Sequence, residues 1–584
     1  MVKFFIGLFT GAFLCVLTAV IFVFSLAKLG TDRTPSVDSA STLVLELEGE
    51  IPERPPVTFP LPAFENQAPL TVHEVWDVLR KASTDDRIKA VVLKPRSLRV
   101  GWAKLQEIRA DLEKFKKSGK PLVAFLVQPG TAEYYLASAA DQIYMGPEEN
   151  LYIKGLRAEM MYFRKTFDKL GVEVEIEHAG KYKDFGDMFV RESMSPETRE
   201  VLNSVLDALY ADLINTIAKG RKQDPAAVRA TIDQGPYLAG QAKKLGLVDD
   251  LIYEDQAMDQ LKKKLKQSEL KLINSKDYSK ITPESLGLTG DNKIAYVVGQ
   301  GGISRGDEGD GSSDDGIGSV GFSKLLRKVA DDSSIKGVVV RVDSPGGDAV
   351  ASDDIWREMK RLSKAKPLVI SMSDAAASGG YYMSMSGDPV LAYTGTFTGS
   401  IGVVYGKANL RGFYDKIGIT KDSLTRGKFA DIDSDYKPMS PEGRQKLREG
   451  IDATYTAFVS RVAEARKKPY EEIEPLAQGR VWLGSQAKGN GLIDEIGGID
   501  RAIELVKERA KIGKDQKVTL VAYPPKRTFL EVMFGQSADT PIVETAIRAR
   551  FGQMSDRILK HSWMLELFEQ GGMISLMPYV IEVK

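Results

Sequence analysis

The stretch DAAASGGYYM, Asp374–Met383, sets one serine among small residues and directly before two glycines. Ser378 has the setting of a nucleophile at the start of a helix, where free backbone N–H groups and the helix dipole favour a developing oxyanion. The alternative is a helix-capping serine followed by glycines for close packing. A serine nucleophile also needs a base, usually histidine, and none of the three histidines lies near Ser378 in sequence.

A second glycine-rich turn, SPGG at Ser344–Gly347, follows the apolar strand pattern GVVVRVD. Glycines after a strand leave backbone N–H groups bare, as an oxyanion hole requires. The alternative is an ordinary tight turn. Gly346 and Gly347, with Gly379 after the serine, are therefore the candidate oxyanion donors.

The elements that would position these residues occur twice in the chain. VLRKASTDDRIKAVVLK, Val78–Lys94, resembles LLRKVADDSSIKGVVVR, Leu325–Arg341, and further segments match at a spacing near 247 residues. Two copies of one domain explain such self-similarity. Within each copy, short apolar strands alternate with amphipathic helices, which predicts an α/β fold with largely parallel strands.

The predicted organisation has four parts: an N-terminal anchor in 1–30, a first α/β repeat over 41–275, a second α/β repeat over 291–515, and a C-terminal extension of unknown role over 516–584. The chain has 80 basic and 80 acidic side chains, so nothing indicates a nucleic acid as partner. Its single cysteine, Cys15, excludes a disulfide within the chain.

The N-terminal run Phe4–Ala27 has 24 residues and no charge. As a helix it would span about 36 Å, enough to cross a bilayer with some tilt. The alternative is a cleaved signal peptide, because Ser25-Leu26-Ala27 resembles a cleavage site. The apolar stretch is longer than a usual signal-peptide core, which favours an uncleaved membrane anchor.

The two copies differ where chemistry is expected. In the first copy Thr131 takes the place of Ser378 and the double glycine is missing. In the second copy Ala430 takes the place of Lys183. A Ser–Lys dyad divided between the copies accounts for both differences, whereas the alternative for Lys183 is a solvated surface lysine.

A lysine serves as a base only when it is neutral. Its reference pKa of about 10.4 leaves roughly one part in 2,500 neutral at pH 7. Closing that gap takes about 4.6 kcal/mol, which burial in an apolar interface approaches. A hydroxyl neighbour would orient the amine without adding charge, and Ser400 in TGTFTGSIGV is the candidate.

The motifs SPGG, ASGGYY, TGSIG and GKYK followed by MSP are all present in the chain. Together they resemble the signal peptide peptidase A (protease IV) family, in its long, duplicated form. The resemblance implies two tandem crotonase/Clp-protease-like α/β domains after a transmembrane helix. It also implies a membrane-anchored serine protease that degrades cleaved signal peptides and other apolar peptides, needs no cofactor or metal, and assembles as a homotetramer.

Carried over by motif, the resemblance makes Ser378 the nucleophile, Lys183 the general base and Ser400 the residue that holds the lysine amine. The glycines of SPGG and Gly379 would supply the oxyanion N–H groups. One departure is visible, because Asp184 follows the lysine. An adjacent carboxylate would raise the lysine pKa, so we expect Asp184 to point away.

The resemblance places the protein in the plasma (inner) membrane as a single-pass protein with extracytoplasmic catalytic domains, or in the thylakoid membrane. Three other functions compete with this one: a crotonase-type acyl-CoA enzyme, a non-catalytic membrane scaffold, and a Ser-His-Asp protease. The last would use His178, five residues before Lys183, and would leave the extra lysine unexplained.

Overall fold

The computed structural model describes residues 35–55, 68–306, 316–525 and 573–577, together with positions 7, 11, 14 and 18. The predicted anchor, Phe4–Ala27, lies outside the described residues apart from those four positions. Among the residues that are described, no helix combines the length and the apolar character needed to cross a membrane. The anchor therefore stays a prediction.

A six-stranded parallel sheet forms the first repeat, in the order β8-β4-β3-β2-β1-β9. Its central strands are apolar along most of their length, because clusters of buried side chains lie on both faces of the sheet. The strands of this repeat are β1 (Ser41–Glu48), β2 (Ile88–Arg96), β3 (Leu122–Leu126), β4 (Gln142–Met145), β5 (Asn150–Leu151), β6 (Glu173–Ala179), β7 (Tyr237–Leu238), β8 (Asp250–Leu251) and β9 (Lys271–Asn274).

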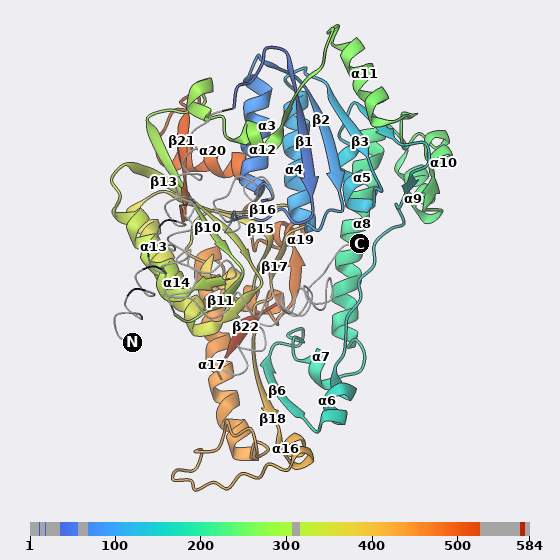
Figure 1. Ribbon diagram of the computed structural model, residues 1–584. Helices are drawn as coiled ribbons and strands as arrows, with labels where there is room; N and C mark the ends of the chain where they lie inside the picture. The colour runs from blue at the N-terminus through green and yellow to red at the C-terminus, as the bar shows by residue number, and fades with distance from the viewer. Residues whose placement is uncertain are drawn as a thin grey trace.

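Helices cover this sheet (Figure 1). The first of them begins at a capping box, in which the Thr71 side chain accepts a hydrogen bond from the Glu74 backbone N–H at 3.1 Å. The helices are α3 (Val72–Thr84), α4 (Trp102–Lys116), α5 (Thr131–Ala137), α6 (Arg164–Leu170), α7 (Asp187–Val190), α8 (Pro196–Arg221), α9 (Pro225–Asp233), α10 (Ala239–Lys244), α11 (Glu254–Lys264), α12 (Ser275–Ser279) and the 3-10 helix η1 (Pro283–Leu286).

The second repeat has a corresponding sheet in the order β19-β17-β15-β13-β10-β21, with β16 beside β15 and β20 beside β16. Its strands are β10 (Asn292–Gln300), β11 (Gly302–Ser304), β12 (Gly316–Gly318), β13 (Ile335–Ser344), β14 (Gly346–Asp348), β15 (Leu368–Ala377), β16 (Val390–Ala392), β17 (Phe397–Gly399), β18 (Val403–Asn409), β19 (Val481–Leu483), β20 (Glu495–Ile496), β21 (Val518–Tyr523) and β22 (Ile574–Leu576).

Its helices are α13 (Ser319–Asp331), α14 (Ala349–Ala365), α15 (Gly379–Met383), α16 (Arg411–Ile417), α17 (Pro441–Arg466), α18 (Tyr470–Ile473), η2 (Glu474–Leu476), α19 (Gly484–Asn490) and α20 (Ile499–Arg509). The main elements of the two repeats correspond, since α3 and α13 begin 247 residues apart and α8 and α17 both have 26 residues. β21 pairs with β10 as β9 pairs with β1. The extension predicted over 516–584 thus begins with a strand of the second sheet.

A third sheet joins the two repeats, in the order β12-β11-β14-β22-β18-β6. β6 of the first repeat pairs antiparallel with β18 of the second along seven residues. In Figure 1 the long helices α8 and α17 descend from the two main sheets toward this shared pair of strands. A strand of the first repeat, β6, therefore belongs to the same sheet as strands of the second repeat. Lys183 follows shortly after the end of β6.

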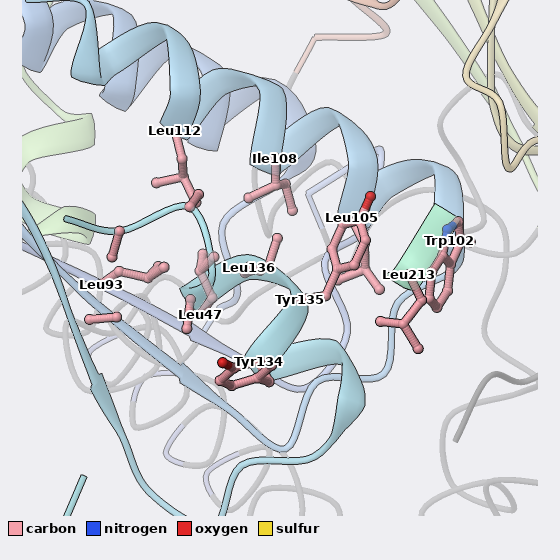
Figure 2. Packing of buried hydrophobic residues seen from close by; sticks show 14 of the residues in the cluster. Leu47, Leu93, Trp102, Leu105, Ile108, Leu112, Tyr134, Tyr135, Leu136 and Leu213 are labelled. Atoms are coloured by element: carbon pink, nitrogen blue, oxygen red, sulfur yellow. The ribbon is translucent and has the colours of Figure 1, made fainter. Parts of the chain in front are cut away.

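Apolar packing fixes one side of α4. Figure 2 shows Leu105, Ile108 and Leu112 on one side of α4, pointing toward Tyr134 and Leu136 of α5, and all of them are buried. This i, i+3, i+7 spacing is the apolar stripe of a helix that lies against a core.

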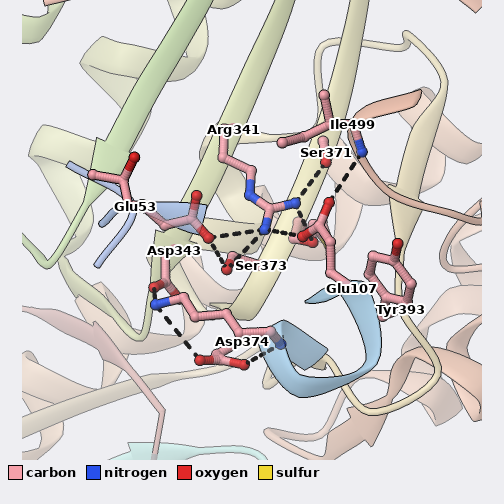
Figure 3. A network of polar contacts seen from close by, with 12 residues as sticks. Glu53, Glu107, Arg341, Asp343, Ser371, Ser373, Asp374, Tyr393 and Ile499 are labelled. Atoms are coloured by element: carbon pink, nitrogen blue, oxygen red, sulfur yellow. Dashed lines mark hydrogen bonds and ion pairs between the residues drawn. The ribbon is translucent and has the colours of Figure 1, made fainter. Parts of the chain in front are cut away.

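A buried polar network lies between the repeats (Figure 3). The Arg341 guanidinium of β13 pairs with the carboxylates of Glu53 and Glu107 from the first repeat. Asp374 on β15 accepts a hydrogen bond from the Lys104 backbone N–H at 2.9 Å, and the Lys104 ammonium pairs with Asp343 at 2.7 Å. These contacts tie β15, the strand that ends just before Ser378, to the start of α4.

Candidate active site

Ser378 lies at the junction between β15 and α15, in the predicted strand-to-helix turn. Its φ of 53° and ψ of −114° are unusual for a residue other than glycine, and it is fully buried. The backbone N–H of Ser378 donates to the Gly399 carbonyl at 2.8 Å. The side chain makes no capping hydrogen bond to α15, so the helix-cap alternative does not describe it.

Lys183 meets this serine from the other repeat. The Lys183 amine Nζ lies 2.7 Å from Ser378 Oγ, 2.9 Å from the Ser400 carbonyl oxygen and 3.1 Å from Ser400 Oγ. The lysine is fully buried, so it is not a solvated surface lysine. The structure thus brings together the three side chains that the sequence singled out.

Burial sets the charge state of this amine. Loss of hydration holds the pKa of Lys183 well below its ordinary value, and the neighbouring Asp184 carboxylate only partly opposes that shift. Asp184 accepts a hydrogen bond from the Thr198 hydroxyl in the first turn of α8. A neutral lysine beside a serine hydroxyl is able to accept its proton.

Ser400 fixes the direction of the lysine amine. It follows β17, is fully buried, and holds a positive φ of 49°. Its backbone N–H donates to the Arg480 carbonyl at 2.7 Å, which ties this turn to the loop before β19. Both oxygens of Ser400 therefore face Lys183 from a backbone that is held in place.

The loop 478–480 was not predicted as part of the site. The Tyr182 backbone N–H donates to the Gln478 carbonyl at 2.8 Å, and Gly479 has a φ of 75°. A Cβ on Gly479 would lie 2.5 Å from the Lys183 backbone nitrogen. Only glycine permits this approach, and nothing in the local sequence AQGR shows that it faces a segment far earlier in the chain.

The glycines of the two turns converge. A Cβ on Gly346 would lie 2.7 Å from the Gly379 amide nitrogen, and one on Gly379 would lie 3.1 Å from the Gly347 amide nitrogen. The Gly346 N–H already donates to Ser344 Oγ at 3.2 Å. Of the three predicted oxyanion donors, Gly347 and Gly379 are thus the pair whose amides border a common space.

The histidines lie apart from this arrangement wherever the structure describes them. His73 is half-buried in the first repeat and stacks on Tyr296 with ring centroids 5.0 Å apart. His178 is exposed on β6, with its Nδ1 3.0 Å from the Gly180 carbonyl oxygen. Neither of these two described rings has a hydrogen bond to Ser378, so the geometry favours lysine over histidine as the base; His561 is outside the described residues.

Two segments of the chain match one protease family. The model of peptidase family S49 matches residues 114–268 and again residues 360–513. The chain belongs to peptidase family S49. The predicted family and the predicted class, a serine protease in two tandem copies, are confirmed, which decides against an acyl-CoA enzyme.

Relatives of this type match along most of the chain. The chain is 34% identical over 543 residues to the chloroplastic serine protease SPPA of Arabidopsis thaliana, covering 92% of this chain and 79% of that one. It is 30% identical to Protease 4 of Salmonella typhi, covering 83% and 81%. Among solved structures, a mutant ClpP1 from Listeria monocytogenes matches with 16% identity and a TM-score of 0.24, covering 36% of this chain and 94% of that one.

Proposed function

We propose that this S49 protein is an endopeptidase whose nucleophile, Ser378, and base, Lys183, come from different repeats. The distance of 2.7 Å between Lys183 Nζ and Ser378 Oγ, in a site with no solvent exposure, supports this most directly. The alternative of a non-catalytic scaffold leaves no reason to bury an amine against a strained serine, since both features cost stability.

The reaction follows from the positions of these groups. Neutral Lys183 takes the proton of Ser378 Oγ as that oxygen attacks the substrate carbonyl carbon, and Ser400 keeps the amine in line. The amides of Gly347 and Gly379 stabilise the oxyanion. Lys183 then gives the proton to the leaving amine, and water, deprotonated by the same lysine, hydrolyses the ester on Ser378 to regenerate the enzyme.

Apolar peptides are the proposed substrates, including cleaved signal peptides. Phe185, Phe189 and Val404 form a buried apolar cluster at the third sheet, and Phe185 is only two residues from Lys183. Anchoring by Phe4–Ala27 in the plasma membrane, or in a thylakoid membrane, would hold the site close to such peptides. Assembly as a homotetramer also belongs to this proposal and rests on the sequence resemblance.

Loss of the nucleophile tests the proposal. Ser378→Ala in the full chain is expected to abolish cleavage of a fluorogenic apolar peptide and labelling by a serine-reactive probe, while the far-UV circular dichroism stays that of wild type. The fold is expected to survive because the Ser378 side chain caps no helix. Turnover that persists in the purified variant would rule out Ser378 as the nucleophile.

A further inference from the structure

β22 fills a strand position that lies across the candidate active site. It runs antiparallel to β14 on one side and to β18 on the other, with Gly347 opposite Ser575 and Val404 opposite Ile574. In the order of this sheet β22 stands between β14 and β18, so a space one strand wide separates them. Figure 1 shows β22, in dark red, between elements of much earlier sequence.

The carbonyl of Ser575 lies at the converging amides. A Cβ on Gly346 would be 2.1 Å from the Ser575 carbonyl oxygen and 2.7 Å from the Gly379 amide nitrogen, so these two atoms border the same small space. The amide of Gly347, which borders that space, belongs to the residue paired with Ser575. A peptide strand paired in the same register would place its own carbonyl oxygen at this position.

Backbone contacts continue on both sides of Ser575. The Ala349 N–H donates to the Met573 carbonyl at 3.1 Å, and the Met577 N–H donates to the Pro345 carbonyl at 2.8 Å. The segment thus crosses the site in extended form, as a peptide does when it adds a strand to a sheet. Its direction and register place the Ser575–Leu576 peptide bond next to the oxyanion amides.

The side chains of the segment fit their surroundings. Ile574 and Leu576 are buried in the apolar cluster of Phe185, Phe189 and Val404. Ser575 is buried, and its hydroxyl donates to the Gly402 carbonyl at 3.4 Å. The space between β14 and β18 therefore accepts an apolar, extended peptide with a small residue at the reactive carbonyl.

A cavity adjoins one end of the segment. Next to Met573 lies a cavity of 1180 Å³ that is also lined by Arg305, Tyr382, Tyr405 and Arg461. A longer peptide in the place of β22 would continue from the Met573 position into this cavity.

We propose that Met573–Met577 is an internal competitor that occupies the peptide-binding groove of the protease and must leave before a substrate binds. This inference rests on the proposed function, because it takes the Ser378 site as the place where peptides are cut. A tethered segment competes at a high effective concentration, so substrates bind more weakly than the groove itself allows.

Peptide binding to full-length Ser378→Ala protein tests the proposal without any catalysis. The probe is a fluorescein-labelled peptide with the sequence Met-Ile-Ser-Leu-Met, followed by anisotropy. Adding Ile574→Asp puts a charge into the apolar cluster and should release the segment, so we expect the probe to bind at least tenfold more tightly. Leu424→Asp, at a side chain that is 91% exposed, is the matched control and should leave the affinity unchanged.

A second variant guards against misfolding of the first. Ser575→Pro removes one backbone N–H from the strand without burying a charge, and it should also tighten probe binding. Equal affinity in the parent, Ile574→Asp and Ser575→Pro, or binding to none of them, would overturn the proposal. The Ser378→Ala background has no nucleophile, so these binding measurements do not depend on peptide cleavage. A wild-type protein that failed to cleave peptides would contradict the proposed function but would not change the binding result.

Discussion

At the scale of residues, the central feature is an amine that is deprived of water and given only hydroxyl and carbonyl partners. Lys183 touches Ser378 and Ser400 and has one carboxylate neighbour, which is engaged by Thr198. Burial lowers the pKa of Lys183, which favours the neutral amine that the proposed base requires. The cost of this arrangement appears in the stability of the protein.

Replacing Lys183 by methionine tests how burial of the amine affects the free energy of unfolding. The folded-state pKa of Lys183 lies below the unfolded value of about 10.4, so the unfolded chain binds the extra proton between these two values and wild-type stability rises with pH across that window. Lys183→Met does not titrate there. In urea unfolding from pH 7 to pH 10, wild type should gain about 1 kcal/mol or more relative to Lys183→Met. A constant difference would mean that folded Lys183 is charged.

At the scale of elements, the proposed site needs two turns of the second repeat, Ser344–Gly347 and the turn at Ser378. Both must lie close to the segment of the first repeat that carries Lys183. The loop 478–480 packs against the segment that carries Lys183. Any side chain at Gly479 would collide with the Lys183 backbone nitrogen. The β6–β18 pairing holds the strand that leads into the same segment. The position of Lys183 is thus set by elements that carry no catalytic group.

Gly479→Ala tests this positioning. Alanine disfavours a φ of 75°, and its Cβ would displace the Lys183 backbone. We expect kcat to fall about 100-fold with a smaller change in KM, because misplacement of about 1 Å has that effect. Gly489→Ala in α19, whose Cβ would meet nothing within 4 Å, is the control and should match wild type. Wild-type kcat in Gly479→Ala would contradict this account.

At the scale of the whole molecule, the proposed active site draws residues from both repeats, and a buried polar network lies between these repeats. Arg341 is fully buried between Glu53 and Glu107 of the other repeat. Removing one partner of a buried pair leaves an uncompensated charge.

Arg341→Met should therefore lower the free energy of unfolding by about 3–5 kcal/mol, measured by urea denaturation. Arg361→Met, which breaks a pair whose arginine side chain is 62% exposed, should change it by about 1 kcal/mol or less. Equal effects of the two substitutions would show that the network does not hold the repeats together.

Much of this organisation was predictable because the chain contains two copies of one domain, which can be compared with each other. The repeat predicted two α/β domains with largely parallel strands, and the differences at Ser378 and Lys183 predicted a dyad divided between copies. The approach of Gly479 to Lys183 was not predictable, since it depends on how two distant loops pack. β22 was also missed, because the segment near Ser575 has no counterpart in the first repeat and its three-residue pairing leaves no periodic pattern.

The pH dependence of kcat/KM tests the dyad most directly. Lys183 must be neutral to act, so kcat/KM should rise with pH on a single limb whose apparent pKa lies well below the free-lysine value of about 10.4, and His178→Ala should show the same limb. Lys183→Ala should lose nearly all turnover at every pH. If instead His178→Ala is inactive and the wild-type limb titrates near about 6.5, the base is a histidine and the Ser378–Lys183 dyad is wrong.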